Sequence, residues 1–431
     1  MKIEQIIEKI EGEAKLDFDF VDGQVCDAKI EFELFRGIEH ILQDKPFLDS
    51  LVITPRVCGI CNHSHLIASI RAIEDGLNNA GVDIQLSSKA NLIREFTLSC
   101  ELIQNHIKWF YLTISPKVNE LLGISSLANY APRASFVAYT ITKAMAIFSG
   151  QWPHSSYVVI GGVSCDPTYV EILQAKTYID EVIRFVEDVL LGVSLETYLS
   201  FSSLSSLGKL GGDMGGLFDA MSSSYLAHSG KGHDRFIVFG DCLCFKTGKS
   251  VPTQVRRIDP KYVQEVYQNH SKSKAVTYKQ RQYEVGPLAR GMISKDPLIK
   301  SLHKRYKDSI LTRIFARMHE VAILLAYNKR VLNALDLSEP SCNLQKLDTK
   351  HISFDGVGVV EASRGSLIHK SKVKDGKIKE YEIIVPTQWN LSNGFGDEKG
   401  IAIKSMIGCS SSKEAELVFR SFDVCSACSV H

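Results

Sequence analysis

The chain has 431 residues, 45% of them hydrophobic, and its 50 lysines and arginines nearly balance 49 aspartates and glutamates, which leaves a net charge of +1. This length allows one large domain or two to three lobes, and the balanced charge argues against nucleic acid or an anionic membrane as the main partner. The sequence shows neither an apolar run long enough to span a bilayer nor a signal-peptide pattern, so we expect no direct membrane insertion.

Residues 14–34 predict a β-hairpin, because apolar and polar residues alternate on both sides of an Asp22-Gly23 turn. A helix is expected to begin within residues 35–39. A helical core is expected over about residues 62–200, where apolar residues recur at steps of three and four. The clearest helical patterns lie at residues 87–114, 134–148 and 167–191.

The second half of the chain mixes helical and β patterns. Residues 202–230 are rich in glycine and serine and predict a loop, whereas residues 297–337 are expected to contain a long helix, marked by apolar residues from Ile310 to Leu335, whose charged side chains are solvated or paired. Short β-like runs predict mixed β segments at about residues 235–290 and 351–390. The expected fold class is α+β and predominantly α, with a long-helix bundle core, a peripheral β-hairpin and small sheets. We expect one large domain over residues 1–431.

Two C-x-x-C motifs stand out among eleven cysteines: Cys58 with Cys61, and Cys425 with Cys428. Two thiolates at this spacing can grip one metal ion, because the tight turn between them places both sulfurs on one side. For either motif alone, a structural zinc site or a redox dithiol is the better explanation. The other seven cysteines are interpreted as reduced and mostly buried, which favours a reducing, cytoplasmic location.

The positions of the two motifs change this interpretation. They lie at opposite ends of the chain, whereas small zinc sites close within a few tens of residues. A shared site would therefore draw both chain ends into the middle of a large protein. Polar residues flank both motifs and suit the surroundings of a buried charged centre. They are Arg56, His65, Asp423 and His431.

The motif Arg-x-Cys-Gly-x-Cys-x-x-x-His at residues 56–65 and the motif Ser-Phe-Asp-x-Cys-x-x-Cys-x-x-His at residues 421–431 together resemble the large subunit of nickel-iron hydrogenases. The resemblance implies nickel held by four thiolates, and iron that carries cyanide and carbon monoxide ligands, a Ni-Fe(CN)2(CO) centre. Soft thiolate donors suit these metals. By the family pattern, Cys58 and Cys425 bind nickel alone, and Cys61 and Cys428 bridge to iron.

The resemblance covers essentially the whole chain and implies further roles. Glu11, in an Ile-Glu-Gly block, matches a glutamate that passes protons to and from a cysteine. Glu39 matches a glutamate that helps to hold a magnesium ion, whose other protein ligands would be the backbone carbonyl of Ile383 and the imidazole of His431. On spacing alone, a solvated surface glutamate explains Glu11 or Glu39, and a solvated tail explains His431.

Two blocks near the end resemble the surroundings of the iron ligands. In the family, the residue matching Arg364 overhangs the open side of the metals, and those matching Val385, Pro386 and Thr387 line the pocket for the diatomic ligands. A cyanide nitrogen accepts hydrogen bonds from a guanidinium or a hydroxyl group, while carbon monoxide suits apolar walls.

Three positions depart from the family pattern. Asn105 stands where many members have an aspartate near the metals, so this chain lacks the charge that the carboxylate would add to the local field or to proton handling. Ser363 and Val424 each stand where the family has a proline. Losing these prolines frees two backbone φ angles without removing a ligand.

The resemblance implies reversible oxidation of dihydrogen to protons and electrons, with Arg364 or a cysteine thiolate, for which Cys425 is the candidate, as the base. After the four ligand cysteines, no cysteine cluster remains for an iron-sulfur cluster, so an iron-sulfur small subunit is the expected electron partner. Export together with that subunit stays open.

Maturation proteins are also expected partners. In the family a C-terminal extension is commonly clipped after the residue that matches His431 once nickel is inserted, so the sequence shows either the mature form or a gene without the extension. The alternatives are a hydrogen sensor with the same ligands and slow turnover, and a structural zinc site in an α-rich protein.

Overall fold

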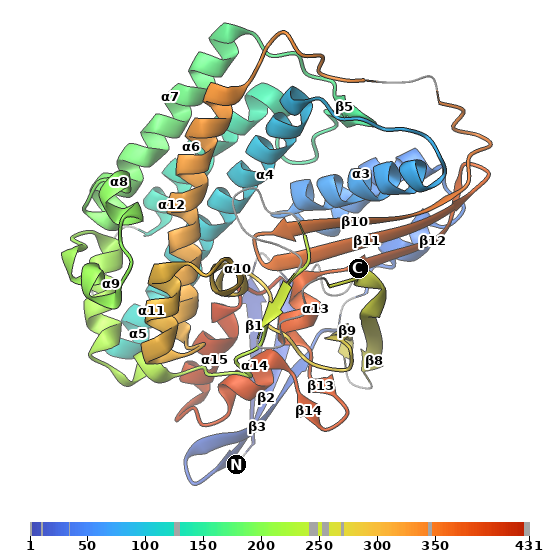
Figure 1. Cartoon of the computed structure of the whole chain (residues 1–431). Helices are drawn as coiled ribbons and strands as arrows, with labels where there is room; N and C mark the ends of the chain where they lie inside the picture. Colours follow the sequence, from blue (N-terminus) through green and yellow to red (C-terminus); the bar gives the residue numbers. More distant parts are fainter. Residues whose placement is uncertain are drawn as a thin grey trace.

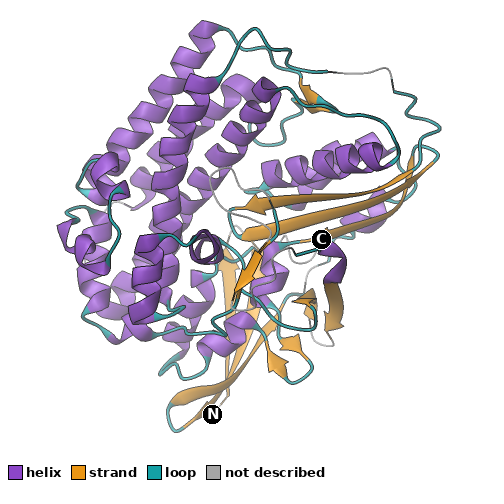
Figure 2. Ribbon diagram, in the orientation of Figure 1, coloured by secondary structure: helices purple, strands orange, loops and turns teal. Residues whose placement is uncertain are grey.

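The computed structural model describes residues 2–9, 12–33, 35–124, 130–240, 249–251, 258–268, 271–343 and 347–425. Long helices stand together on one side of the molecule, and most strands gather on the other side (Figure 1 and Figure 2). This arrangement confirms the predicted α+β class with a helical bundle as its core. Among the described helices, none combines the length and apolarity that crossing a bilayer requires.

Four long helices form the bundle: α4 (Ser88–Trp109), α6 (Tyr130–Ser149), α7 (Tyr169–Phe185) and α12 (Ile310–Ala334). α6 and α12 each pack against both α4 and α7. α12 lies inside, because nearly every residue from Ile310 to Leu325 is buried. Ser87 and Ser309 begin α4 and α12 by accepting a backbone N–H from three residues further on.

The predicted helices at residues 87–114, 134–148 and 167–191 are confirmed. α4 and α7 each end in a π-helical turn, and α4 leads through its turn into α5. The π-helical turn after α4 is Phe110–Ile114, the one after α7 is Val186–Leu191, and α5 is Ser115–Leu122.

The long helix predicted within residues 297–337 is confirmed as α12, and a shorter helix precedes it. α11 (Pro297–Tyr306) ends where Lys307 takes a positive φ of 59°, and α12 begins shortly afterwards. Four ionisable side chains in the first half of α12 are buried and paired, which is one of the two predicted outcomes. They are Arg313, Arg317, His319 and Glu320.

The prediction of a loop at residues 202–230 is wrong. α9 (Asp213–Ser222) lies there between two short 3-10 turns, Leu204–Lys209 and Tyr225–His228. Gly215 lets α9 pack closely against the backbone of Leu210, since a Cβ on Gly215 would lie 2.3 Å from the Leu210 carbonyl oxygen. This glycine does not reverse the chain.

The N-terminal sheet contains three antiparallel strands: β1 (Lys2–Lys9), β2 (Gly12–Val21) and β3 (Gln24–Glu31). Asp22 and Gly23 join β2 to β3 with positive φ angles of 50° and 77°, which a two-residue hairpin turn requires. The predicted hairpin is confirmed. β1 was not predicted, because its three isoleucines do not alternate with polar residues.

A second three-stranded sheet positions the candidate site. It contains β10 (Phe354–Ala362), β11 (Gly365–Lys374) and β12 (Lys377–Ile384), all antiparallel. Helix α3 (Asn62–Asn79) packs closely on β10. Gly358 makes this possible, because a Cβ there would lie 1.9 Å from the Ala68 carbonyl oxygen. The start of α3 therefore lies near the turn that joins β10 to β11.

Short elements fill the rest of the described chain, and the described parts of residues 235–290 contain the expected short strands. The strand pairs are β4 (Val158–Val159) with β5 (Gly162–Val163), β6 (Phe236–Val238) with β7 (Lys249–Val251), β8 (Val263–Gln268) with β9 (Ser271–Tyr278), and β13 (Gly394–Phe395) with β14 (Glu398–Lys399). The short helices are α1 (Ile38–Leu42), α2 (Ser50–Ile53), α8 (Leu195–Leu199), α10 (Pro287–Ser294), α13 (Pro386–Leu391), α14 (Ile401–Met406) and α15 (Ser412–Ser421).

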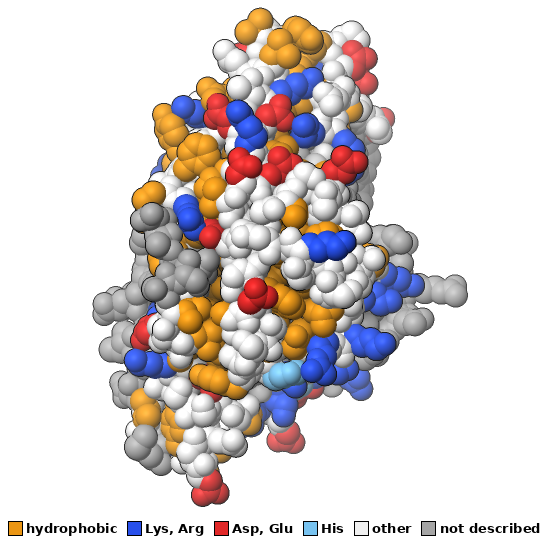
Figure 3. Space-filling model, turned by 90° about the vertical axis from the view of Figure 1, so that its left-hand side faces the viewer, with side chains coloured by type: hydrophobic (Ala, Val, Ile, Leu, Met, Phe, Trp, Pro, Cys, Tyr) orange, Lys and Arg blue, Asp and Glu red, His pale blue; other side chains and the backbone are white. Residues whose placement is uncertain are grey.

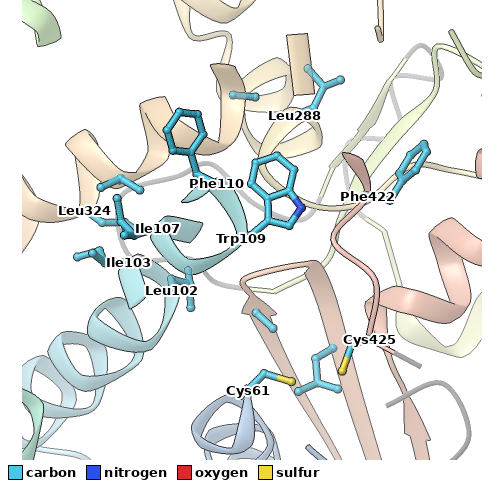
Figure 4. Packing of buried hydrophobic residues seen from close by; sticks show 14 of the residues in the cluster. Cys61, Leu102, Ile103, Ile107, Trp109, Phe110, Leu288, Leu324, Phe422 and Cys425 are labelled. Carbon is cyan, nitrogen blue, oxygen red and sulfur yellow. The ribbon is translucent and has the colours of Figure 1, made fainter. Parts of the chain in front are cut away.

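One hydrophobic cluster extends from Ala14 in β2 to Cys425 and joins the bundle to both large sheets. Figure 4 shows Trp109 and Phe110 within this cluster, together with Cys61 and Cys425. The single domain stays a prediction, which this shared cluster supports. On the face shown in Figure 3, acidic and basic side chains are interspersed with apolar ones, in keeping with the balanced net charge.

We expect Gly358→Ala to lower the free energy of unfolding by more than about 1 kcal/mol, because the added methyl group overlaps the α3 backbone and forces α3 away from β10. Thermal unfolding monitored by circular dichroism measures the change. Gly216→Ala is the control, since Gly216 is exposed and a Cβ there meets nothing within 4 Å. Equal melting temperatures for the two variants would contradict the close packing of α3 on β10.

Candidate metal centre

Three buried thiols from opposite ends of the chain meet in the described structure. The Sγ atoms of Cys58, Cys61 and Cys425 all lie within 4.8 Å of one another, and those of Cys58 and Cys425 are 3.6 Å apart. Figure 4 shows the Cys61 and Cys425 side chains pointing toward the same space. Thiolates this close repel one another unless a cation lies between them, so the group suits a soft or borderline metal ion.

Local backbone geometry carries both chain ends to this point. The turn Thr54–Val57 leads into the first thiol loop, where the Cys61 N–H donates to the Cys58 sulfur at 3.1 Å. At the other end, Asp423 follows α15 with a positive φ of 61°, a conformation that aspartate tolerates better than most residues.

Three predicted site residues, Glu11, Cys428 and His431, lie outside the described residues.

Arg364 and Asp423 form a buried ion pair near the thiols. Arg364 Nη2 donates to Asp423 Oδ1 at 3.0 Å, and Arg364 Nε donates to the Asp423 carbonyl oxygen at 2.8 Å. Burial alone would lower the pKa of Arg364, but the negative charges of Asp423, Cys425, Cys61 and Cys58 raise it well above its usual range. Arg364 therefore brings a fixed positive charge to the thiols.

A small cavity adjoins the thiols. Its walls come from α3, from the turn between β10 and β11, and from the start of α13, and they include Cys61, His65, Arg364, Val385, Pro386 and Thr387. The Thr387 hydroxyl is buried and has no hydrogen-bond partner within the part of the chain that the structure describes. Leaving such a group unpaired is costly. An acceptor in the cavity, such as a cyanide nitrogen, would pair with it, so the lining fits the predicted iron ligands.

His65 is held by a second histidine that the sequence analysis did not single out. His65 Nδ1 lies 3.1 Å from His369 Nε2, and His369 Nδ1 lies 2.9 Å from the Tyr381 hydroxyl. The alternation of β11 places His369 on the buried face of the sheet. That signal was present in the sequence, but nothing there indicated that α3 covers this face.

A series of buried charges continues behind the ion pair. Arg317 Nη1 donates to Asp423 Oδ2 at 3.0 Å and lies 2.9 Å from His106 Nδ1. His106 Nε2 lies 3.0 Å from Glu320 Oε1, and Arg290 donates to both Glu320 oxygens, at 2.6 and 2.9 Å.

The pKa values of this series follow from burial and from the neighbouring charges. Burial raises the pKa of Glu320, but the charge of Arg290 and the contact with His106 lower it to about 2. Burial lowers the pKa of His106 to about 4. The series therefore places ionised carboxylates and arginines around a neutral imidazole at pH 7.

The structure brings two of the predicted magnesium ligands together. Glu39 Oε1 accepts a hydrogen bond from the Ile383 N–H at 2.8 Å, and Glu39 Oε2 lies 3.5 Å from Lys274 Nζ. The contact with Ile383 uses its N–H group and not the predicted carbonyl group. The neighbouring ammonium group of Lys274 would compete with a divalent cation for the Glu39 carboxylate.

A family model described as nickel-dependent hydrogenase matches residues 36–115 and 241–431. These ranges contain both C-x-x-C motifs and the Arg364 turn. Among curated proteins, the periplasmic [NiFeSe] hydrogenase large subunit of Desulfomicrobium baculatum is 24% identical, over 98% of this chain and 93% of the relative. Sulfhydrogenase 1 subunit alpha of Pyrococcus furiosus is 26% identical, over 99% of this chain and 96% of the relative.

Solved structures show a similar fold in hydrogenases. The structure of the Ni-Fe-Se hydrogenase from D. vulgaris Hildenborough in the reduced state superposes with a TM-score of 0.83 and 22% sequence identity, and the match covers 100% of both chains. Shared motifs, shared fold and the geometry of the three thiols agree. The chain belongs to the nickel-dependent hydrogenase family.

Proposed function

We propose that this chain is the catalytic large subunit of a nickel-iron hydrogenase, which oxidises dihydrogen to protons and electrons and catalyses the reverse reaction. The observation that carries the proposal is the meeting of three buried thiols, drawn from both chain ends, near the fixed positive charge of Arg364. Membership of the nickel-dependent hydrogenase family supports the same activity.

Cys58, Cys61, Cys425 and Cys428 are the proposed nickel ligands, and Cys61 and Cys428 are also the proposed bridges to iron. When bound, the nickel-iron group supplies a Lewis acid that polarises dihydrogen and a sink for its electrons. The site would keep this group away from water, since the three described ligand cysteines are at most 5% exposed. Low exposure also strengthens every charge interaction at the site.

Arg364 has a different role from the thiolates. A guanidinium stays protonated in proteins, and two hydrogen bonds to Asp423 hold Arg364 in place, so it serves as a donor and a fixed charge, which favours a cysteine thiolate, with Cys425 as the candidate, as the base. Thr387 is the proposed donor to a cyanide ligand, and Val385 and Pro386 form the apolar walls for carbon monoxide. Glu11 remains a predicted proton carrier on the basis of the sequence alone.

A magnesium site at Glu39, the Ile383 carbonyl and His431 remains a proposal. The closeness of Glu39 to Ile383 supports it, and the contact of Glu39 with Lys274 argues for an ammonium group at the same place. Metal analysis of the purified protein separates the two possibilities.

An iron-sulfur small subunit is the proposed electron partner. One curated relative is described as a large subunit and another as subunit alpha, which supports assembly with at least one other chain. Maturation proteins for nickel insertion are proposed on the family resemblance. One relative is described as periplasmic, so the cytoplasmic location stays a prediction. The hydrogen sensor would use the same ligands, and its turnover rate would distinguish it from an enzyme.

We expect Cys61→Ser to lose most of its nickel and its hydrogen uptake, because a serine hydroxyl is a hard donor that does not replace a bridging thiolate. Elemental analysis and hydrogen-dependent dye reduction measure the two losses. Cys342→Ser is the control. Cys342 is half-buried and donates to the Ile160 carbonyl oxygen, a bond that a hydroxyl also makes. Normal nickel content and turnover in Cys61→Ser would reject the ligand assignment.

Arg364→Lys should keep the nickel but lower kcat by about 10- to 100-fold, because lysine preserves the charge and loses the forked contact with Asp423. Hydrogen oxidation with an artificial acceptor measures kcat. Arg133→Lys provides the comparison, since Arg133 pairs with Asp213 through a single nitrogen near the surface. An Arg364→Lys protein that turns over at the wild-type rate would remove Arg364 from the mechanism.

A further inference from the structure

A carboxylate from α4 holds the start of the helix that follows Cys61. Glu101 is only 1% exposed. Its Oε2 accepts the N–H of His63 at 2.8 Å, and its Oε1 accepts the N–H of Ser64 at 3.0 Å. The Ser64 hydroxyl also donates to Oε1. Three hydrogen bonds therefore converge on one buried side chain that the sequence analysis did not single out.

These bonds complete a helix end that lacks a cap of its own. Cys61 occupies the N-cap position of α3 and makes no side-chain capping bond. The first N–H groups of a helix have no partner inside the helix, and a negative charge at this end also gains from the helix dipole. Because Cys61 directly precedes α3, the position of its thiolate depends on the backbone that Glu101 holds.

α4 contacts the thiol loop on the other side of Cys61 as well. Asn105, one turn after Glu101, donates through Nδ2 to the Ile60 carbonyl oxygen at 2.9 Å and to Ser363 Oγ at 3.4 Å. Neighbouring positions on one face of α4 thus bind the residues before and after Cys61 and the turn that carries Arg364.

The charge of Glu101 is coupled to the same centre. Burial raises the pKa of Glu101 to about 7, while the hydrogen bonds from Ser64 and His63 and the positive charge of Arg364 act to lower it. Glu101 is therefore mostly ionised only above pH 7, and the positive charge of Arg364, from a different part of the fold, favours that ionised form.

We propose that Glu101 is a positioning residue of the metal centre: it fixes the Cys61 thiolate through the start of α3, and in the ionised form that its three hydrogen-bond donors favour it adds a negative charge that raises the electron density at the metals. This inference rests on the proposed nickel-iron hydrogenase function. It assigns to Glu101 an electrostatic effect on the centre in addition to its effect on stability.

Infrared spectra of the purified protein test the proposal, because the cyanide and carbon monoxide bands report the electron density at iron. In Glu101→Gln we expect these bands to move to higher wavenumber, and kcat to fall by about 10- to 100-fold with nickel content preserved. Glu101→Asp keeps the charge and should stay nearer to the wild type in both measurements.

Thr97→Val is the matched control. Thr97 lies one turn before Glu101 on α4 and contacts the His63 ring at 3.1 Å and the Tyr157 hydroxyl at 2.6 Å, without a charge. We expect a lower melting temperature and unchanged bands. Bands at wild-type positions in Glu101→Gln, or equal shifts in Thr97→Val, would show that Glu101 only stabilises the fold and would overturn the proposal.

A second variant covers the case in which Glu101→Gln does not assemble its metals. Ser64→Ala removes one of the three hydrogen bonds and should move the bands in the same direction by a smaller amount, whereas unmoved bands would reject the proposal. A wild-type protein without cyanide and carbon monoxide bands would reject the nickel-iron function itself. If the wild-type protein shows the cyanide and carbon monoxide bands but the bands of the variants do not move, only the role of Glu101 is rejected.

Discussion

The ion pair between Arg364 and Asp423 is the interaction on which the centre depends. Buried thiolates repel one another and lose their hydration, so they need positive charge close by. Arg364 supplies that charge from the turn between β10 and β11. Its partner is Asp423, which lies two residues before Cys425. The same contact therefore balances charge and fixes the place where the C-terminal segment enters the core.

The surrounding frame keeps this contact in place. α3 packs on β10 through a position where only glycine fits, which ties the thiol loop at the start of α3 to the turn at the end of β10. α4 binds the same loop through Asn105 and Glu101. Two elements that belong to different layers of the fold thus hold one loop from two sides, and precise geometry at a metal centre requires support of this kind.

Much of the site was predictable because it rests on local motifs. The C-x-x-C pairs, Arg364 and the run of residues 385–387 were identified from the sequence. The structure places Cys61, Arg364 and residues 385–387 around one cavity, and the thiols of Cys58 and Cys425 lie beside that of Cys61. Glu101 and His369 were missed, because each acts through an element that is remote in sequence. A buried glutamate in a helical pattern looks like any polar residue until the helix that it caps is known.

The fold was predictable to a similar degree. Periodicity identified the bundle helices and the hairpin of β2 and β3, since apolar spacing follows from burial on one face. The loop predicted at residues 202–230 failed, because glycine there serves close backbone contacts as in Gly215 and not chain reversal. A composition rule cannot separate these two uses of glycine.

The buried charges behind the centre constrain how this sequence can change. Arg364, Asp423, Arg317, His106 and Glu320 touch in series, and most of them have partners on both sides. Replacing one member leaves a neighbour with an unpaired buried charge. The resulting loss of folding free energy exceeds the net contribution of the original contact. Tolerated substitutions are therefore expected to come in compensating pairs, so the residues at these positions should change together. In sequence comparisons, they should vary jointly.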